Sequence, residues 1–99
     1  MGAWVTAADQ RLGRDDIDQL LSRLGTPRWW SNGADETYVP HTHPYHKVLY
    51  CVAGSIVFQV DGDDHMLSPG DRLDVEPGTE HAASVGPQGV QCGEVAVDG

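Results

Sequence analysis

Three histidines and a lysine lie close together in residues 40–54, PHTHPYHKVLYCVAG, and are the residues of this sequence best suited to chemistry. His41 and His43 are two positions apart, so on a β-strand both side chains project to the same face, about 6.5–7 Å apart along the backbone. Two imidazoles at that spacing can bind one metal ion if a neighbouring strand supplies a further ligand. The spacing therefore predicts part of a metal site at the start of an apolar strand.

A histidine that can complete this site is His81, which follows the turn-rich segment PGDRLDVEPGTE. With HTH and Gly54 before it, this order of motifs resembles the cupin family, in which paired histidines, a glutamate and a closing glycine precede a second motif that contains a histidine. The glycines of that second motif correspond to Gly70 and Gly78. The resemblance covers roughly residues 38–97. It implies that His41, His43 and His81 bind a divalent transition metal ion, Fe, Zn, Ni, Mn or Cu.

The sequence departs from the cupin pattern at several positions, and one of them changes the chemistry. The family's opening glycine, glutamate ligand, proline and final asparagine are replaced here by Asp35, Lys47, Glu76 and Val85. In cupins the glutamate commonly completes a shell of three histidines and one glutamate, whereas a protonated lysine has donors and no free lone pair. The resemblance therefore implies a shell of three histidines with positions open to water or substrate.

Lys47 has a role of its own in the interpretation that we favour. By strand alternation it faces the same side as His41 and His43, where it can bind a substrate carboxylate or enolate, or act as a base. Tyr45 shares this facing and can line the same pocket. We therefore treat Lys47 and Tyr45 as the candidate catalytic residues.

Two other interpretations remain open. In one, Pro44 breaks the strand and a bulge turns His46 inward, so that His46 replaces the missing glutamate. In the other, no metal binds, Lys47 pairs with a carboxylate such as Glu76, and the barrel binds an organic anion or nothing. A separate interpretation of Lys47 itself is a solvated lysine at a strand edge.

The elements that must position these residues are one helix and a set of short strands. Apolar residues recur at helical spacing at Ile17, Leu20, Leu21 and Leu24. This stripe predicts an amphipathic helix over about residues 15–24, with Asp15 or Asp16 as its cap and Gly25 as its end. The stripe must be buried against one face of a sheet.

Short segments rich in Val, Ile and aromatic residues follow residue 38, among them KVLYCV and SIVFQV on the two sides of Gly54, with turns such as AGS, SPGD and PGTE between the segments. This pattern is typical of a small antiparallel sandwich or barrel. We divide the chain into an N-terminal segment, residues 1–37, and a barrel, residues 38–99, within one domain. The resemblance implies an all-β fold, a small cupin-type β-barrel (double-stranded β-helix) with one short N-terminal helix, and a homodimer.

Composition limits the partners of this chain of 99 residues. The formal net charge of −9 disfavours phosphate backbones, so we expect no nucleic acid partner. We expect no membrane partner, because no apolar run is long enough to span a bilayer. The first residues lack the pattern of a signal peptide, so we expect a cytoplasmic protein. Cys51 and Cys92 are expected to be small buried apolar residues, with a disulfide between them as the alternative.

The expected function is a metal-binding small cupin of unassigned activity. A mononuclear metal-dependent enzyme of the oxygenase or isomerase type, acting on a small anionic substrate, is the leading hypothesis. The alternative is a non-catalytic module that binds a carboxylate or a sugar in the same pocket. A third hypothesis is a degenerate barrel with a structural role only.

Overall fold

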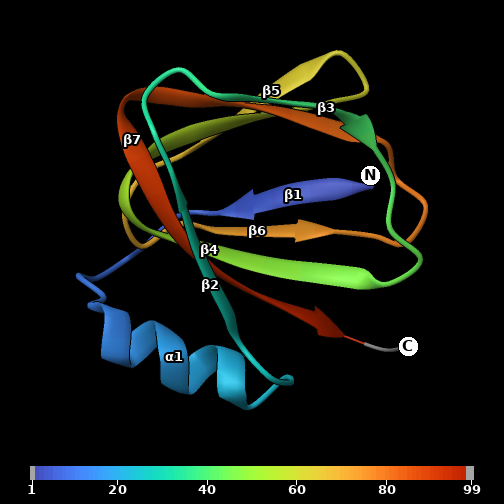
Figure 1. Ribbon diagram of the computed structural model, residues 1–99. Helices are drawn as coiled ribbons and strands as arrows, with labels where there is room; N and C mark the ends of the chain where they lie inside the picture. Colours follow the sequence, from blue (N-terminus) through green and yellow to red (C-terminus); the bar gives the residue numbers. More distant parts are fainter. Residues whose placement is uncertain (1, 98–99) are drawn as a thin grey trace.

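The computed structural model describes residues 2–97, which form one helix and seven strands (Figure 1). In chain order the elements are β1 (Ala3–Thr6), α1 (Arg14–Ser22), β2 (Arg28–Asn32), β3 (Thr37–His41), β4 (His46–Val60), β5 (Asp63–Leu67), β6 (Arg72–Val75) and β7 (His81–Val97). The predicted all-β barrel with one short N-terminal helix is confirmed. Within residues 2–97, no helix has the length and apolar character needed to cross a membrane.

The seven strands belong to one antiparallel sheet built around β4 and β7, which pair from His46–Val97 to Gln59–Ala82. The first half of β4 also pairs with β6, and its second half with β5. Likewise β7 pairs with β3 near its start and with β2 further along. Both long strands bend between these partners, so the sheet curls around an interior (Figure 1).

The bend in β4 explains one difference from the sequence prediction. We expected separate strands on the two sides of Gly54, but β4 runs through it with register shifts between Cys51 and Ala53 and between Gly54 and Ile56. Gly54 has a φ of 74°, and a Cβ there would collide with the carbonyl oxygen of Gly89 on β7. Only glycine combines this backbone conformation with so close an approach.

Helix α1 lies on the outer face of the sheet, and its apolar stripe is buried there as predicted (Figure 1). Ile17 and Leu21 are fully buried and belong to a cluster with Val48, Tyr50 and Val95. The helix is shorter than predicted, so Leu24 lies past its end and is 40% exposed. Its N-cap is Gly13 rather than Asp15 or Asp16, and Asp16 instead accepts a hydrogen bond from the Gly13 N–H at 2.9 Å.

The sheet takes in strands from the segment that we placed before the barrel. β1 pairs with β6 from Ala3–Val75 to Thr6–Arg72, and β2 pairs with β7 from Arg28–Glu94 to Asn32–Val90. No element was predicted for residues 1–13, because the four residues AWVT are too short to show a clear period. Strand β1 gains its stability from β6, a partner far along the chain.

The barrel interior is filled by alternate side chains of the long strands, among them Leu49, Cys51 and Phe58. Cys51 and Cys92 lie opposite each other on β4 and β7, and both are fully buried. Both thiols are free, so they serve as buried residues and the disulfide alternative is wrong.

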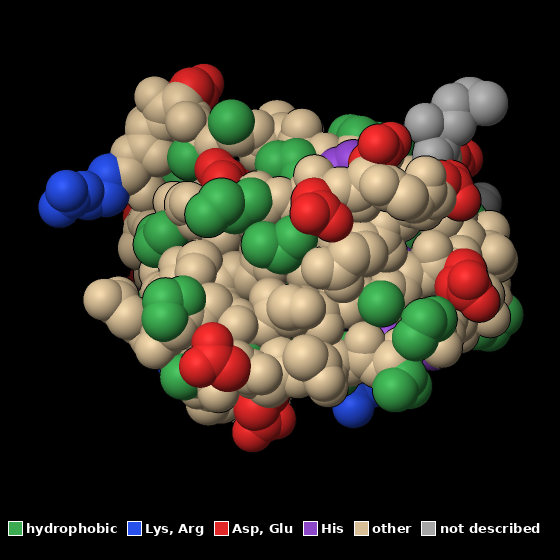
Figure 2. Space-filling view, turned by 90° about the horizontal axis from the view of Figure 1, so that it is seen from above, with side chains coloured by type: hydrophobic (Ala, Val, Ile, Leu, Met, Phe, Trp, Pro, Cys, Tyr) green, Lys and Arg blue, Asp and Glu red, His purple; other side chains and the backbone are tan. Residues whose placement is uncertain are grey.

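The surface reflects the acidic composition of the chain. Figure 2 shows a face on which Asp and Glu side chains are scattered among apolar and neutral ones, with few Lys or Arg side chains. This distribution agrees with the formal net charge of −9. The molecule therefore presents a surface that repels anions over long range.

Candidate metal centre and pocket

The fold brings His41, His43 and His81 together. His41 is the last residue of β3 and lies opposite His81, the first residue of β7, while His43 lies in the link to β4. Their ring centroids are 4.3 Å apart for His41 and His81, 4.9 Å for His41 and His43, and 5.2 Å for His43 and His81. One nitrogen from each ring can be chosen so that all three lie within 4.8 Å of one another. This is a set of donors able to converge on one ion.

Backbone hydrogen bonds fix which nitrogen of two rings is available. The Nδ1–H of His41 donates to the carbonyl of Val39 at 2.7 Å, and the Nδ1–H of His81 donates to the carbonyl of Thr79 at 2.9 Å. A carbonyl oxygen only accepts, so Nδ1 carries the proton and Nε2 of the neutral ring keeps its lone pair. This arrangement is the one that metal-binding histidines use.

Two of these nitrogens lack any partner in the protein. Nε2 of His43 and Nε2 of His81 are buried, and neither forms a hydrogen bond within residues 2–97. Burial lowers the pKa of both imidazoles, and the charge of Lys47 lowers it further, so both rings are neutral at pH 7. Buried lone pairs without a partner cost free energy unless something binds them. The three histidines therefore fit a divalent transition metal ion.

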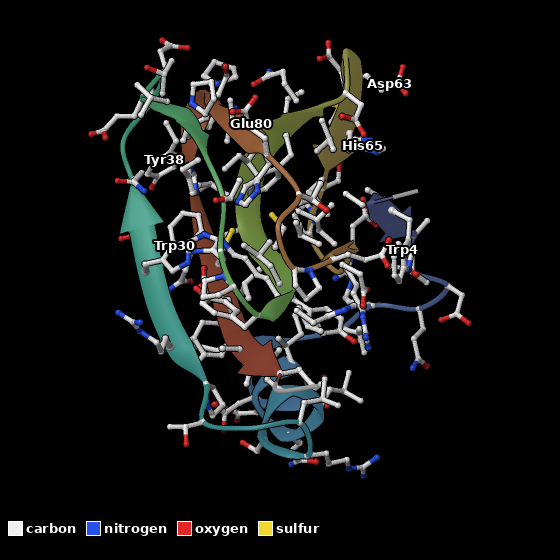
Figure 3. All side chains as sticks on the ribbon, turned by 90° about the vertical axis from the view of Figure 1, so that its right-hand side faces the viewer. Trp4, Trp30, Tyr38, Asp63, His65 and Glu80 are labelled. Carbon is white, nitrogen blue, oxygen red and sulfur yellow. The ribbon has the colours of Figure 1, made fainter. Side chains whose placement is uncertain are left out.

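A pocket of about 380 Å³ opens beside this cluster. Its lining includes His41 and His43, whereas His81 is 1% exposed and does not line it. Aromatic side chains supply much of the wall: Trp29, Trp30, Tyr38, Tyr45 and Phe58. Figure 3 shows Trp30 and Tyr38 near each other on the side of β2 and β3, with Trp4 on the opposite side of the molecule. A pocket of this size and lining suits a small organic molecule.

Lys47 lines the same pocket and is already paired. Its Nζ lies 3.3 Å from Oε1 of Glu94, and its side chain is 9% exposed. The same Oε1 accepts a hydrogen bond from Nε1–H of Trp30 at 2.7 Å. The solvated-lysine interpretation is therefore wrong. The expected pairing of Lys47 with a carboxylate is present, but the partner is Glu94 rather than Glu76, whose carboxylate instead accepts a hydrogen bond from the backbone N–H of Gly2.

Glu94 is the pocket residue that the sequence prediction missed. In the strand VQCGEVAV, alternation places it on the same face as the buried Val90 and Cys92. A carboxylate on the apolar face of a strand is unusual and was the available signal. Its diagonal neighbour across the β4–β7 pair is Lys47, because Leu49 lies directly opposite Glu94.

His46 points away from the pocket, so the interpretation in which it replaces the missing glutamate is wrong. Its Nε2 lies 2.9 Å from Oδ2 of Asp74, and its ring makes an edge contact with Trp4 at 5.9 Å. Asp74 also binds Arg72 at 2.7 Å. Regular alternation holds from His46 to Cys51 because this part of β4 pairs with β7 without a register shift.

Tyr45 lies beside His43 in the wall of the pocket. Its ring stacks on that of His43 with centroids 4.9 Å apart, and it belongs to the pocket lining. Burial raises the pKa of the Tyr45 phenol, and the nearby Glu94 charge raises it further. The phenol is therefore a neutral hydrogen-bond donor at pH 7, placed beside one candidate metal ligand.

Comparison with known proteins gives a family and a set of similar folds. The family model described as the cupin domain matches residues 28–88. A solved RmlC-like cupin from Shewanella frigidimarina is 24% identical with a TM-score of 0.66, over 75% of this chain and 66% of that chain. A DUF861-family protein from Thermotoga maritima is 10% identical with a TM-score of 0.67, over 95% of this chain and 98% of that one. No curated protein matches.

A third similar structure is the polyketide cyclase RemF from Streptomyces resistomycificus, which is 21% identical with a TM-score of 0.66. The match covers 73% of this chain and 53% of RemF, so the chain spans about half the length of that protein. At these identities the likeness shows the fold alone.

Proposed function

This chain belongs to the cupin family, and on that basis we propose that His41, His43 and His81 hold a divalent transition metal ion in a pocket for a small organic molecule. One observation carries the proposal: Nε2 of His43 and Nε2 of His81 are buried without a partner in a cluster of three imidazoles. Iron, zinc, nickel, manganese and copper all accept such ligands.

We propose an enzymatic role of the oxygenase or isomerase type for this site. A bound ion with open positions would supply Lewis-acid or redox chemistry. The chain's own residues would orient the substrate: aromatic side chains exclude water, Tyr45 donates a hydrogen bond, and Lys47 with Glu94 contacts polar groups at the wall.

A second candidate is a binding module without catalysis. The observation in its favour is that Lys47 is held by Glu94, which restrains it from acting as a free base or cation. Chelation separates the two candidates once a ligand is known. A module would still bind its ligand after the metal is removed, whereas the enzyme would lose turnover.

Elemental analysis of the purified, tag-free protein beside a His43→Ala variant tests the proposal. We expect near-stoichiometric metal in the wild type and its loss in the variant. His65→Ala is the matched control, because His65 lies on β5 outside the cluster, and it should keep the metal. Wild-type protein that takes up no metal after incubation with each of the five divalent ions would refute the three-histidine site.

A further inference from the structure

We infer that Lys47 and Glu94 form a ligand-positioning pair that selects a neutral ring bearing hydroxyl groups over an anionic one. The inference deepens the proposed function, because it names the ligand class of the same pocket. It rests on the pocket and on the pair, and not on the presence of the metal.

The two oxygens of Glu94 are used differently. Oε1 contacts both Nε1–H of Trp30 and Nζ of Lys47. Oε2 accepts no hydrogen bond within residues 2–97, and it keeps contact with solvent in a side chain that is 16% exposed. Since Glu94 lines the pocket, Oε2 is an acceptor open to a ligand. Trp30 and Lys47 hold the carboxylate in place, so this acceptor is preorganised.

The charges of the pair favour a hydroxyl group as its ligand. Lys47 and Glu94 together carry no net charge, and a carboxylate brought to Lys47 would also meet Glu94. A hydroxyl group both donates and accepts, so it can donate to Oε2 and accept from Nζ. The acidic surface adds long-range repulsion of anions (Figure 2). The remaining cation of the lining, Arg28, is an exposed residue and is the rival anchor for an anion.

The pocket walls favour a flat ring between the pair and the histidines. Trp30 and Tyr38 meet edge to face with centroids 6.0 Å apart, and Tyr45 stacks on His43. Aromatic walls of this kind bind planar rings through stacking and edge contacts. A ring with two adjacent hydroxyls can place one on the pair and direct the other toward His41 and His43. Catechol is therefore the simplest probe of this ligand class.

The test compares three ligands of similar size: catechol, 1,2-dimethoxybenzene and benzoate. Binding is measured by NMR titration under reducing conditions, on chelator-treated and on zinc-loaded protein, with the Trp30 indole N–H as reporter. A hydrogen bond to a charged group accounts for about tenfold or more in affinity. We expect Glu94→Gln to weaken catechol by at least about tenfold and to strengthen benzoate, because Lys47 is then unpaired. Glu36→Gln, at an exposed glutamate, should change neither.

Opposite changes in the affinities for catechol and benzoate distinguish a positioning role of Glu94 from a structural one, since a damaged pocket would bind both ligands more weakly. The inference is overturned if Glu94→Gln binds catechol as the wild type does, or if wild-type protein prefers benzoate. If Glu94→Gln does not fold, measurements on the wild type still test the inference. Equal affinities of the wild type for catechol and for 1,2-dimethoxybenzene would refute the role of the pair. If the protein distinguishes catechol from the other two ligands but takes up no metal, the proposed function is refuted and the inference stands. If the protein binds metal but does not distinguish catechol from the other two ligands, the inference is refuted and the proposed function stands.

Discussion

Replacing Lys47 by methionine should destabilise the protein by about 3 kcal/mol, although the apolar stem of the side chain is kept. The charges of Lys47 and Glu94 are 3.3 Å apart in a wall where the two side chains are 9% and 16% exposed. At an effective dielectric constant of about 20, that separation corresponds to roughly 5 kcal/mol of gross attraction. The change therefore leaves a largely buried carboxylate with the Trp30 hydrogen bond alone.

Two effects place the cost at the lower end of the range for a broken buried pair, which is about 3–5 kcal/mol. Glu94 keeps its Trp30 donor, and its remaining exposure lets water solvate Oε2. For a domain of 99 residues, about 3 kcal/mol lowers the melting temperature by roughly 12–15 °C. Glu94→Gln should cost a similar amount, because it leaves the Lys47 ammonium unpaired.

A double-mutant cycle measured by urea unfolding tests this reasoning. Lys47→Met combined with Glu94→Gln removes both charges, so the double variant should be more stable than the sum of the single effects by at least about 2 kcal/mol. The control cycle pairs Lys47→Met with Glu76→Gln, which should be additive within about 0.5 kcal/mol. Additivity in the first cycle, or coupling in the second, would refute the assignment of Glu94 as the partner.

Three further changes test other parts of the fold. Burial alone would raise the pKa of Asp74, but hydrogen bonds from Arg72 and His46 outweigh it and hold the pKa below the usual 3.8. Wild type should therefore exceed Asp74→Asn in stability by about 2 kcal/mol above pH 5, and lose this advantage as the pH falls below about 4, in urea titrations at stepped pH. Gly54→Ala should destabilise by about 3 kcal/mol or more in thermal unfolding, because of its positive φ and the collision with β7; a neutral result would contradict the close approach. Leu21→Ala should cost about 2–5 kcal/mol by the same assay, and a cost below about 1 kcal/mol would mean that α1 is not packed on the sheet.

The barrel class and the shared face of His41 and His43 could be predicted because their signals are local, whereas His81 was joined to them through the resemblance to the cupin family. HTH sets the spacing of two imidazoles, and turn residues place His81 at the start of a strand. Gly54 was assigned only as the closing glycine of the first motif, and the structure shows that a Cβ there would collide with β7. Each of these features depends on residues near one another in the chain, or on a motif whose order is itself informative.

The partner of Lys47 could not be predicted in the same way. It depends on the register that places Leu49 opposite Glu94, and the sequence of neither strand determines that register by itself. A shift of two residues would bring a different side chain beside the lysine, with the same faces buried. The N-terminal strand β1 escaped prediction for a related reason, since it is stabilised by β6 rather than by its own sequence.

The long pairing of β4 with β7 also determines when the histidine cluster forms during folding. Contacts between the first residues of β4 and the last residues of β7 close a large loop. The chain loses conformational entropy when this loop closes, before the free energy of the new contacts offsets that loss. Folds dominated by such contacts reach the native state in about milliseconds to seconds. His81 opens β7 and meets His41 once β3 has docked on that strand. An ion bound there therefore stabilises a state reached after the slow step, so it slows unfolding and leaves the rate of folding nearly unchanged.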